Sequence, residues 1–241
     1  MEQTISNATK RVVVTFDARY HGDSPSVGEF TYETMAQDVF NLARHLGMEK
    51  FSVMGHSMGG KTAMTFALLY PSHVEKLVSI DVSPLEQSYL PTTKFDYLSA
   101  LQQVVIQSEQ SPMTLLQAKT LADNALKELG CEATNRNHLV ANFVSKDSKI
   151  VWAGTPDLDL VRQSFPVLRA FPKGLLTREF KQPTLFMKCE NSSYIPYSTF
   201  PEIQETFVNA KFGIIHNSGH FPHIENTTQF MDVLLEFLNS N

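Results

Sequence analysis

Short apolar runs alternate with helically spaced apolar positions through the first third of the chain. Runs at residues 12–16, 51–54 and 77–80 predict three buried strands. Residues 31–46 and 58–70 have the spacing of helices, and Gly47 and Pro71 follow them as stop signals. Strands that alternate with helices at this spacing predict a parallel sheet with crossover helices, which is an α/β fold.

The pattern changes between residues 85 and 180, where apolar positions predict several helices and no strand. The expected helices are 97–105, 115–129, 138–144 and 158–168. Alternation then resumes, with strands at 183–188 and 211–215 and helices at 201–208 and 228–238. We therefore expect a core in two parts, residues 12–84 and 181–241, and a helical lid inserted at residues 85–180.

Composition narrows the class of partner and compartment. Hydrophobic residues make up 42% of the 241 positions, which is enough for a substantial core. The net charge is −5 and no basic block occurs, so nucleic acid is not an expected partner. No apolar run approaches the roughly 20 residues that a transmembrane helix needs. Two distant cysteines, Cys131 and Cys189, favour a reducing compartment over a disulfide scaffold.

The N-terminal segment, residues 1–11, is short and polar. It lacks the apolar region of a secretory signal, and its two basic residues stand only at its end. We therefore expect neither a secretory signal nor a transit peptide in it, and we expect the first structured element to begin at Val12.

The sequence Met54-Gly-His-Ser-Met-Gly-Gly60 lies between a predicted strand and a predicted helix. Gly-x-Ser-x-Gly in this context is typical of a nucleophile elbow, in which Ser57 occupies a sharp, strained turn and small neighbours let strand and helix approach. The turn also places the amide of Met58 at a helix N-terminus, where partial positive charge can hold an oxyanion. Ser57 is thus the expected nucleophile and Met58 the expected oxyanion donor.

A serine nucleophile needs a base, which in this chain order follows the acid. His220 is the best of eight histidines, because it stands in a turn between the last predicted strand and the last helix. His216 is expected to end the strand, and His223 to pack at the helix entry. A metal site built on His220 and His223 would lack a third ligand and a His-Glu-x-x-His pattern, so we expect neither a metal nor a cofactor.

The acid has several candidates. Asp81 follows the third predicted strand, at the edge where open α/β sheets keep their sites, although an aspartate there can also cap the following turn. The segment after the lid, residues 188–193, offers no aspartate. Asp81 is the preferred acid, and Asp157, Asp159 and Glu190 remain alternatives.

These motifs resemble the α/β-hydrolase domain-containing protein 11 family and related bacterial esterases. The resemblance covers essentially the whole chain from Val12 onward and is carried by residues 16–24 (FDARYHGDS), 55–64 (GHSMGGKTAM), 80–84 (IDVSP), 183–186 (PTLF) and 219–220 (GH). It implies an α/β-hydrolase fold with a helical lid, serine esterase or lipase activity and, for animal members, residence in mitochondria.

The resemblance also bears on single positions. The bacterial relatives imply Asp81 as the acid, whereas animal relatives point to the aspartate after the lid tryptophan, here Asp157 after Trp152. Residues 155–156 (TP) depart from the Asn-Leu usual there, and Asn191 with Ser192 matches a family position near the active site that supports His220. Family members carry two further strands and a His-Gly loop, which supplies a second oxyanion amide, before the strand at 12–16. Only eleven residues precede Val12, so we expect an N-terminally shortened fold without that loop.

Two functional hypotheses follow from these residues. The first is a carboxylic ester hydrolase that acts on a small acyl ester or lipid through an acyl-enzyme, without a metal or nucleic acid. Apolar lid residues would form its acyl pocket, although helical spacing is more often plain core packing: Phe95, Leu98, Leu101, Val104, Leu115, Leu116 and Phe143. The second is a weakened or inactive hydrolase-fold binding protein, motivated by the expected loss of the N-terminal loop.

Overall fold

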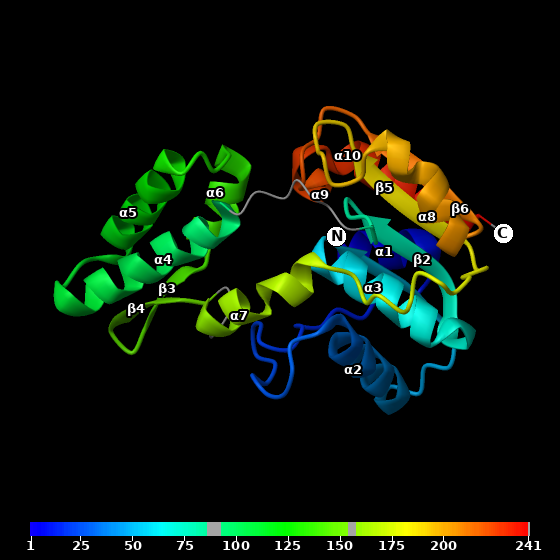
Figure 1. Ribbon diagram of the computed structural model, residues 1–241, viewed down its shortest axis with the longest axis horizontal. Coiled ribbons are helices and arrows are strands. Elements are labelled where there is room, and N and C mark those ends of the chain that lie inside the picture. Colours follow the sequence, from blue (N-terminus) through cyan, green and yellow to red (C-terminus); the bar gives the residue numbers. More distant parts are fainter. Residues whose placement is uncertain (86–92, 154–157, 241) are drawn as a thin grey trace. The chain divides into compact units, whose positions relative to one another are not determined.

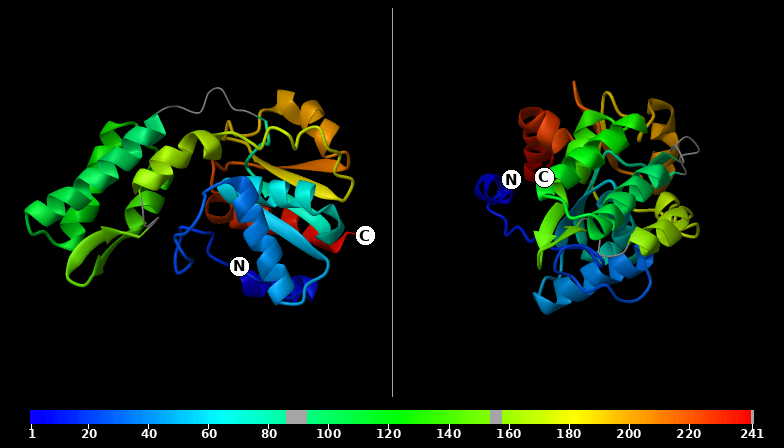
Figure 2. Two further views of the ribbon diagram at one scale, coloured as in Figure 1. Left: turned by 60° about the horizontal axis from the view of Figure 1, so that its bottom comes forward. Right: turned by 90° about the vertical axis from the view of Figure 1, so that its left-hand side faces the viewer.

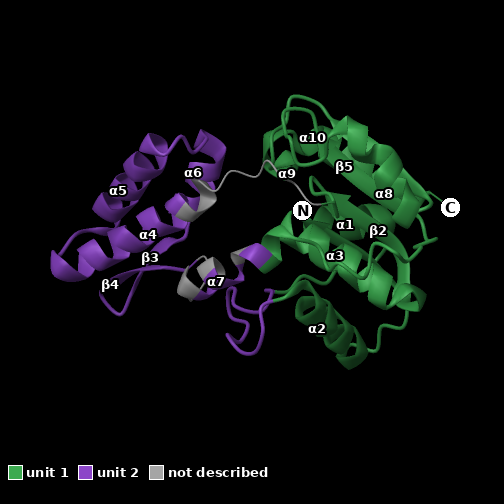
Figure 3. Ribbon diagram, viewed as in Figure 1, with its two compact units in different colours: residues 1–16, 31–87, 167–241 green, residues 17–30, 88–166 purple. Residues whose placement is uncertain are grey.

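A computed structural model describes residues 1–85, 93–153 and 158–240. The chain divides into two compact units (Figure 3), the first of residues 1–16, 31–87 and 167–241 and the second of residues 17–30 and 88–166. These boundaries differ from the expected ones, because residues 17–30 group with the insertion and residues 167–180 group with the core.

A parallel four-stranded sheet forms the centre of unit 1 (Figure 1). Its strand order is β1-β2-β5-β6, with bounds Phe51–His56, Val74–Ile80, Thr184–Cys189 and Ala210–Ile215. Every neighbouring pair is parallel, which confirms the α/β fold expected from the alternating pattern. The carboxyl ends of all four strands consequently meet at one edge of the sheet.

Helices pack on both faces of this sheet. The helices α2 (Tyr32–His45), α3 (Met58–Leu69) and α8 (Phe200–Thr206) share one hydrophobic core with the sheet, and α1 (Glu2–Thr9) and α10 (Thr227–Asn239) share another. Neighbouring residues of β2 contribute to different cores, Leu77 to the first and Val78 to the second, because successive side chains of a strand point to opposite faces. Short helical turns at Pro71–His73 (η1), Tyr197–Thr199 (η2) and Pro222–Glu225 (α9) complete the unit.

The prediction of a strand at residues 12–16 is wrong. The segment has no regular structure, and Val12 is 88% exposed. A strand is stable only when a neighbour accepts and donates its backbone hydrogen bonds, and no described strand lies beside this segment. Its β-branched sequence alone therefore does not make it a strand.

Structure begins earlier than expected, at helix α1. Its single buried apolar side chain, Ile5, packs into the core formed with α10. The two helices lie side by side in the views of Figure 2. One inward apolar residue in a polar octapeptide is too weak a pattern to predict a helix, so tertiary packing decides this element.

Unit 2 has its own core, built from helices and a β-hairpin. Its elements are α4 (Thr93–Gln110), α5 (Leu115–Glu128), α6 (Ala133–Ala141), β3 (Phe143–Lys146), β4 (Lys149–Trp152) and α7 (Leu158–Arg169), whose last residues belong to unit 1. The hairpin corrects the prediction that this region holds no strand and that residues 138–144 are one helix. Its turn residues Asp147 and Ser148 both have positive φ, at 50° and 63°, as a two-residue hairpin loop requires.

Several of the apolar lid residues, for which we expected either an acyl pocket or plain core packing, lie in the core of unit 2. Leu101, Val104 and Phe143 are buried there, whereas Leu116 is 75% exposed. The side chain of Phe95 lies outside the described residues. No described helix is both long and apolar enough to cross a bilayer.

Candidate active site

Four strand ends place the polar residues of the site. Ser57 directly follows β1, Asp81 directly follows β2, Cys189 ends β5, and His220 lies in the loop after β6. The pairing continues past the strands, because the amide of Ser57 donates to the Ile80 carbonyl at 3.1 Å. Since the strands are parallel, residues far apart in sequence meet at one edge of the sheet.

Ser57 occupies a strained backbone turn between β1 and α3. Its φ of 53° and ψ of −117° lie outside the regions that ordinary residues occupy. A Cβ on Gly55 would approach the carbonyl oxygen of Gly59 to 2.0 Å, and one on Gly60 would approach Val82 Cγ1 to 2.5 Å. Gly59 itself has open space around it. The tight packing expected of the elbow therefore depends on Gly55 and Gly60, and Gly59 is not needed for space.

Ser57, His220 and Asp81 form one line of hydrogen bonds. Ser57 Oγ lies 3.0 Å from His220 Nε2, and Asp81 Oδ2 lies 2.8 Å from His220 Nδ1. A carboxylate only accepts, so Nδ1 carries a proton and Nε2 of the neutral ring can accept the serine proton. This arrangement has the geometry of a serine nucleophile, its base and an orienting acid.

Asp81 is completely buried and held at both carboxylate oxygens. Oδ1 accepts the Cys189 amide at 3.0 Å, while Oδ2 faces His220. The Asp81 amide donates to the Met187 carbonyl at 2.8 Å, and the residue has a positive φ of 46°. A buried charge is tolerated only when it is paired and hydrogen-bonded, and both conditions are met here.

The neighbouring Cys189 thiol is fully buried. Burial, followed by the charge of Asp81, raises the pKa of the Cys189 thiol well above its usual value. The thiol therefore stays protonated at neutral pH, and the Cys189 amide donates to the Asp81 carboxylate.

The loop that carries His220 is held at its backbone. The Glu225 carboxylate accepts the amides of Gly219 and Phe221, on either side of His220. Two residues before His220, the Ser218 carbonyl accepts the Asn191 amide at 2.9 Å. Asn191 is thus hydrogen-bonded to the loop of His220, the residue that the family resemblance expected Asn191 to support.

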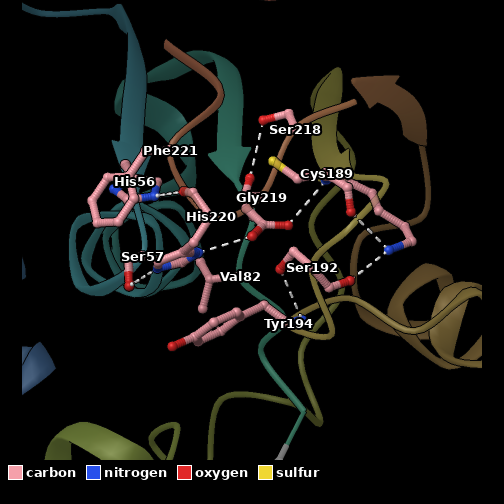
Figure 4. A network of polar contacts seen from close by, with 12 residues as sticks. His56, Ser57, Val82, Cys189, Ser192, Tyr194, Ser218, Gly219, His220 and Phe221 are labelled. Carbon is pink, nitrogen blue, oxygen red and sulfur yellow. Dashed lines mark hydrogen bonds and ion pairs between the residues drawn. The ribbon is translucent and has the colours of Figure 1, made fainter. Parts of the chain in front are cut away.

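Three rings contact the imidazole of His220 (Figure 4), one of them that of the next residue, Phe221, with centroids 5.4 Å apart. Tyr194 stacks on the imidazole with centroids 4.0 Å apart and planes 12° apart. His56 lies on its other side in Figure 4, with centroids 4.5 Å apart. Burial, aided by the nearby His220, lowers the pKa of His56 to about 3, so the His56 ring is neutral at physiological pH.

The Met58 amide is the first N–H of α3, directly after Ser57. The first amides of a helix have no intrahelical acceptor, and they point along the positive end of the helix dipole. The local geometry at Met58 therefore agrees with that of an oxyanion donor.

Glu190, the alternative acid whose side chain the structure describes, does not hydrogen-bond to His220. Glu190 binds instead the amide of Asn217 and the ring of His216, at 2.8 and 3.4 Å. Asp157 and the side chain of Asp159 lie outside the described residues. His223, in α9, contacts the rings of His56, Phe221 and Phe230.

No group of three or more His, Cys, Asp or Glu side chains suited to a metal ion occurs in the described part of the chain. Sequence reasoning overlooked four residues that support the site: His56, Cys189, Tyr194 and Glu225. Only His56 carried a signal, since it directly precedes the expected nucleophile. The other three reach the site through the fold.

The chain is similar to known proteins over most of its length. A family model described as "alpha/beta hydrolase fold" matches residues 5–227. The sn-1-specific diacylglycerol lipase ABHD11 of Xenopus laevis is 36% identical over 242 residues, covering 99% of this chain and 75% of that protein. The protein of the same name from Mus musculus is 37% identical over 231 residues, covering 95% of this chain and 72% of that protein.

A solved structure shows the same likeness in three dimensions. A marine microorganism esterase superposes with a TM-score of 0.82 and is 28% identical, covering 97% of this chain and 88% of the esterase. The likeness thus extends over nearly the whole chain in both sequence and fold.

Proposed function

Since the chain belongs to the alpha/beta hydrolase fold family and, within it, to the group that includes ABHD11, we propose that it is a serine hydrolase that cleaves carboxylic esters. The single observation that carries this proposal is the line from Ser57 Oγ through the His220 imidazole to Asp81, with distances of 3.0 and 2.8 Å. These three groups meet at the carboxyl edge of the sheet although they come from three separate strand ends.

The reaction proceeds in two halves. Ser57 Oγ attacks the ester carbonyl carbon while His220 Nε2 takes the hydroxyl proton, which gives a tetrahedral oxyanion and an imidazolium. The Met58 amide donates to that oxyanion, and Asp81 stabilises the imidazolium. The intermediate collapses as the imidazolium protonates the leaving alcohol, which leaves an acyl group on Ser57.

Water completes the turnover. His220 removes a proton from a water molecule, whose oxygen attacks the acyl carbon of the acyl-enzyme. The second tetrahedral intermediate releases the carboxylic acid and returns the proton to Ser57. Asp81 holds the imidazole in the same orientation during acylation and deacylation, so the three side chains do not have to rearrange between the two half-reactions.

The proposed substrate class is a small acyl ester or a lipid ester. This substrate class is supported by the relatives' name, sn-1-specific diacylglycerol lipase. The reaction steps described above require no cofactor. Residence in mitochondria is proposed from the resemblance to animal family members, and fractionation of cells that express the tagged protein would test it.

The first test is hydrolysis of p-nitrophenyl butyrate by the purified chain and by its Ser57→Ala variant. We expect turnover by the parent and its loss in the variant. Labelling of Ser57 by a fluorophosphonate, read by mass spectrometry, reports the nucleophile without depending on the chosen ester. Equal rates in two folded samples, with no label on Ser57, would contradict the proposal and favour a binding protein without catalytic activity.

A further inference from the structure

His56 links the two reacting residues through a single side chain. It is the last residue of β1 and directly precedes Ser57. Its Nε2 lies 2.6 Å from the carbonyl oxygen of His220. A carbonyl oxygen only accepts, so His56 donates from Nε2.

We propose that His56 is a positioning residue, which fixes the main chain of His220 relative to Ser57 while Tyr194 fixes the plane of the imidazole from the opposite side. This inference rests on the proposed hydrolase function. It assigns to His56 and Tyr194 no contact with substrate and no proton transfer.

The geometry explains why this link is effective. A histidine side chain has two rotatable bonds, so the ring of His56 is a short and stiff connection. At one end it is covalently continuous with Ser57, and at the other it binds the main chain of His220. Serine attack needs the base within hydrogen-bond reach in one orientation, and a displacement of about 1 Å can cost roughly a hundredfold in rate.

Other residues hold the rest of the His220 loop. Glu225 holds the amides of Gly219 and Phe221, and Asp81 holds Nδ1 of the ring. The His220 carbonyl is bound by His56. The base is therefore fixed at its flanking amides, its carbonyl and its ring by different residues.

The protonation state of His56 suits this role. The groups that face it are the imidazoles of His220 and His223 and the carboxylate of Asp81. The pKa of about 3 keeps His56 neutral, so it adds no second positive charge beside the imidazolium that His220 forms. A neutral ring that donates one hydrogen bond positions its neighbour without repelling the charge created during the reaction.

Tyr194 reaches the other face from the loop after β5. Its amide donates to Ser192 Oγ at 3.2 Å, and Lys188 Nζ donates to the Ser192 carbonyl at 2.9 Å. The buried Lys188 thus shapes the loop that carries the stacked ring. Parallel stacking at 4.0 Å restricts rotation of the imidazole out of its plane.

The test compares two substitutions at His56 with a matched control. His56→Leu removes the donor, whereas His56→Gln places an amide N–H where it can reach the same carbonyl. We expect kcat for p-nitrophenyl butyrate to fall roughly ten- to a hundredfold in His56→Leu, and KM to change by less than about threefold. His56→Gln should recover most of kcat. The control is His73→Leu, which removes another ring-to-carbonyl hydrogen bond, that of His73 Nδ1 to Glu49 at 2.7 Å, and should leave kcat unchanged.

Substitutions at Tyr194 test the stacked face independently, in case His56→Leu does not fold. Tyr194→Phe keeps the ring and should retain kcat, whereas Tyr194→Leu should lower it by about tenfold with little change in KM. The control Tyr70→Leu removes a tyrosine stacked on Phe40 at 4.5 Å, elsewhere in unit 1. It should leave kcat unchanged.

A readout without turnover separates this inference from the proposed function. The proton between His220 Nδ1 and Asp81 is expected as a low-field proton NMR signal, observable in the Ser57→Ala background. His56→Leu should broaden or shift that signal, and His73→Leu should not. If the parent hydrolyses no ester but His56→Leu changes the signal, the function fails and the positioning role stands. An unchanged signal and an unchanged kcat in folded His56→Leu would overturn the inference.

Discussion

Gly55 and Gly59 approach so closely that a Cβ on Gly55 would lie 2.0 Å from the Gly59 carbonyl oxygen. The obstacle is main chain, which cannot rotate away as a side-chain tip can. The sharp turn that presents Ser57 therefore depends on a residue without a side chain at Gly55, one position before the end of β1. The three glycines of the motif are consequently not equivalent.

Alanine substitutions should reveal this difference. We expect Gly55→Ala to destabilise the fold by more than about 3 kcal/mol or to prevent folding, because the strand and the first turn of α3 would have to separate. Gly59→Ala should be neutral or stabilising by up to about 1 kcal/mol, because the site is open and alanine favours a helix. Urea unfolding of both variants measures this, and a Gly59→Ala protein less stable than Gly55→Ala would contradict it.

Asp81→Asn should abolish most of the activity while the protein remains folded. An asparagine presents an N–H to one of two donors, the Cys189 amide or His220 Nδ1. If the ring responds by changing its tautomer, Nε2 carries the proton and cannot take one from Ser57. We expect kcat to fall by about 10⁴-fold, the size of loss that follows the same change in a serine protease.

Glu190→Gln is the control for that substitution, since Glu190 was an alternative acid and lies on His216 and Asn217 instead. It should retain kcat. Equal losses in the two variants, measured with p-nitrophenyl butyrate, would remove Asp81 from the role of triad acid.

His56 should make stability depend on pH below neutrality. Its pKa is near 6.5 in the unfolded chain and about 3 in the native protein. Between these values the unfolded chain binds a proton that the native state does not, so the free energy of unfolding decreases as the pH falls through this window. The slope from His56 alone is at most about 1.4 kcal/mol per pH unit.

His56→Gln removes this proton linkage and retains a donor. The difference in unfolding free energy between parent and variant should therefore shift in favour of the variant as the pH decreases from about 7 to about 5. Urea unfolding at both pH values tests this, because the ionisation of other groups cancels in the difference. A constant difference would show that burial does not hold His56 neutral.

Cys189 should resist alkylation in the native protein. Burial and the charge of Asp81 raise the pKa of its thiol, and the reactive thiolate is therefore scarce at neutral pH. Iodoacetamide should modify Cys189 only after urea unfolds the chain, as followed by mass spectrometry. Rapid modification of the folded protein would contradict the buried, protonated thiol.

The sequence pattern predicted most of the sheet and the residues that meet at its edge. Ser57, Asp81 and His220 could be proposed because each stands in a turn after a strong apolar strand pattern, and parallel strands bring such turns together. Their mutual distances required the structure. The supporting residues Tyr194 and Glu225 carry no local pattern, because a stacking contact or a bond to a loop amide depends on how distant segments pack.

The wrong predictions have physical causes. Residues 12–16 have the composition of a strand but no described strand to pair with, so pairing outweighs propensity. The hairpin between Phe143 and Trp152 was missed because its turn is Asp147-Ser148, which lacks the glycine that usually marks a positive φ. Helix α1 has one buried side chain, Ile5, which packs in the core shared with α10. A single apolar position does not give a helical pattern in the sequence, so the helix was not predicted.

The four strand ends of unit 1 also have a consequence for how activity is lost. Ser57, Asp81 and Cys189 follow or end strands held in register by their neighbours, and the His220 loop follows β6. Separation of any one strand therefore breaks the line of hydrogen bonds at once. Activity therefore requires all four strands to remain paired. A partly unfolded intermediate that has lost one strand from the sheet is inactive.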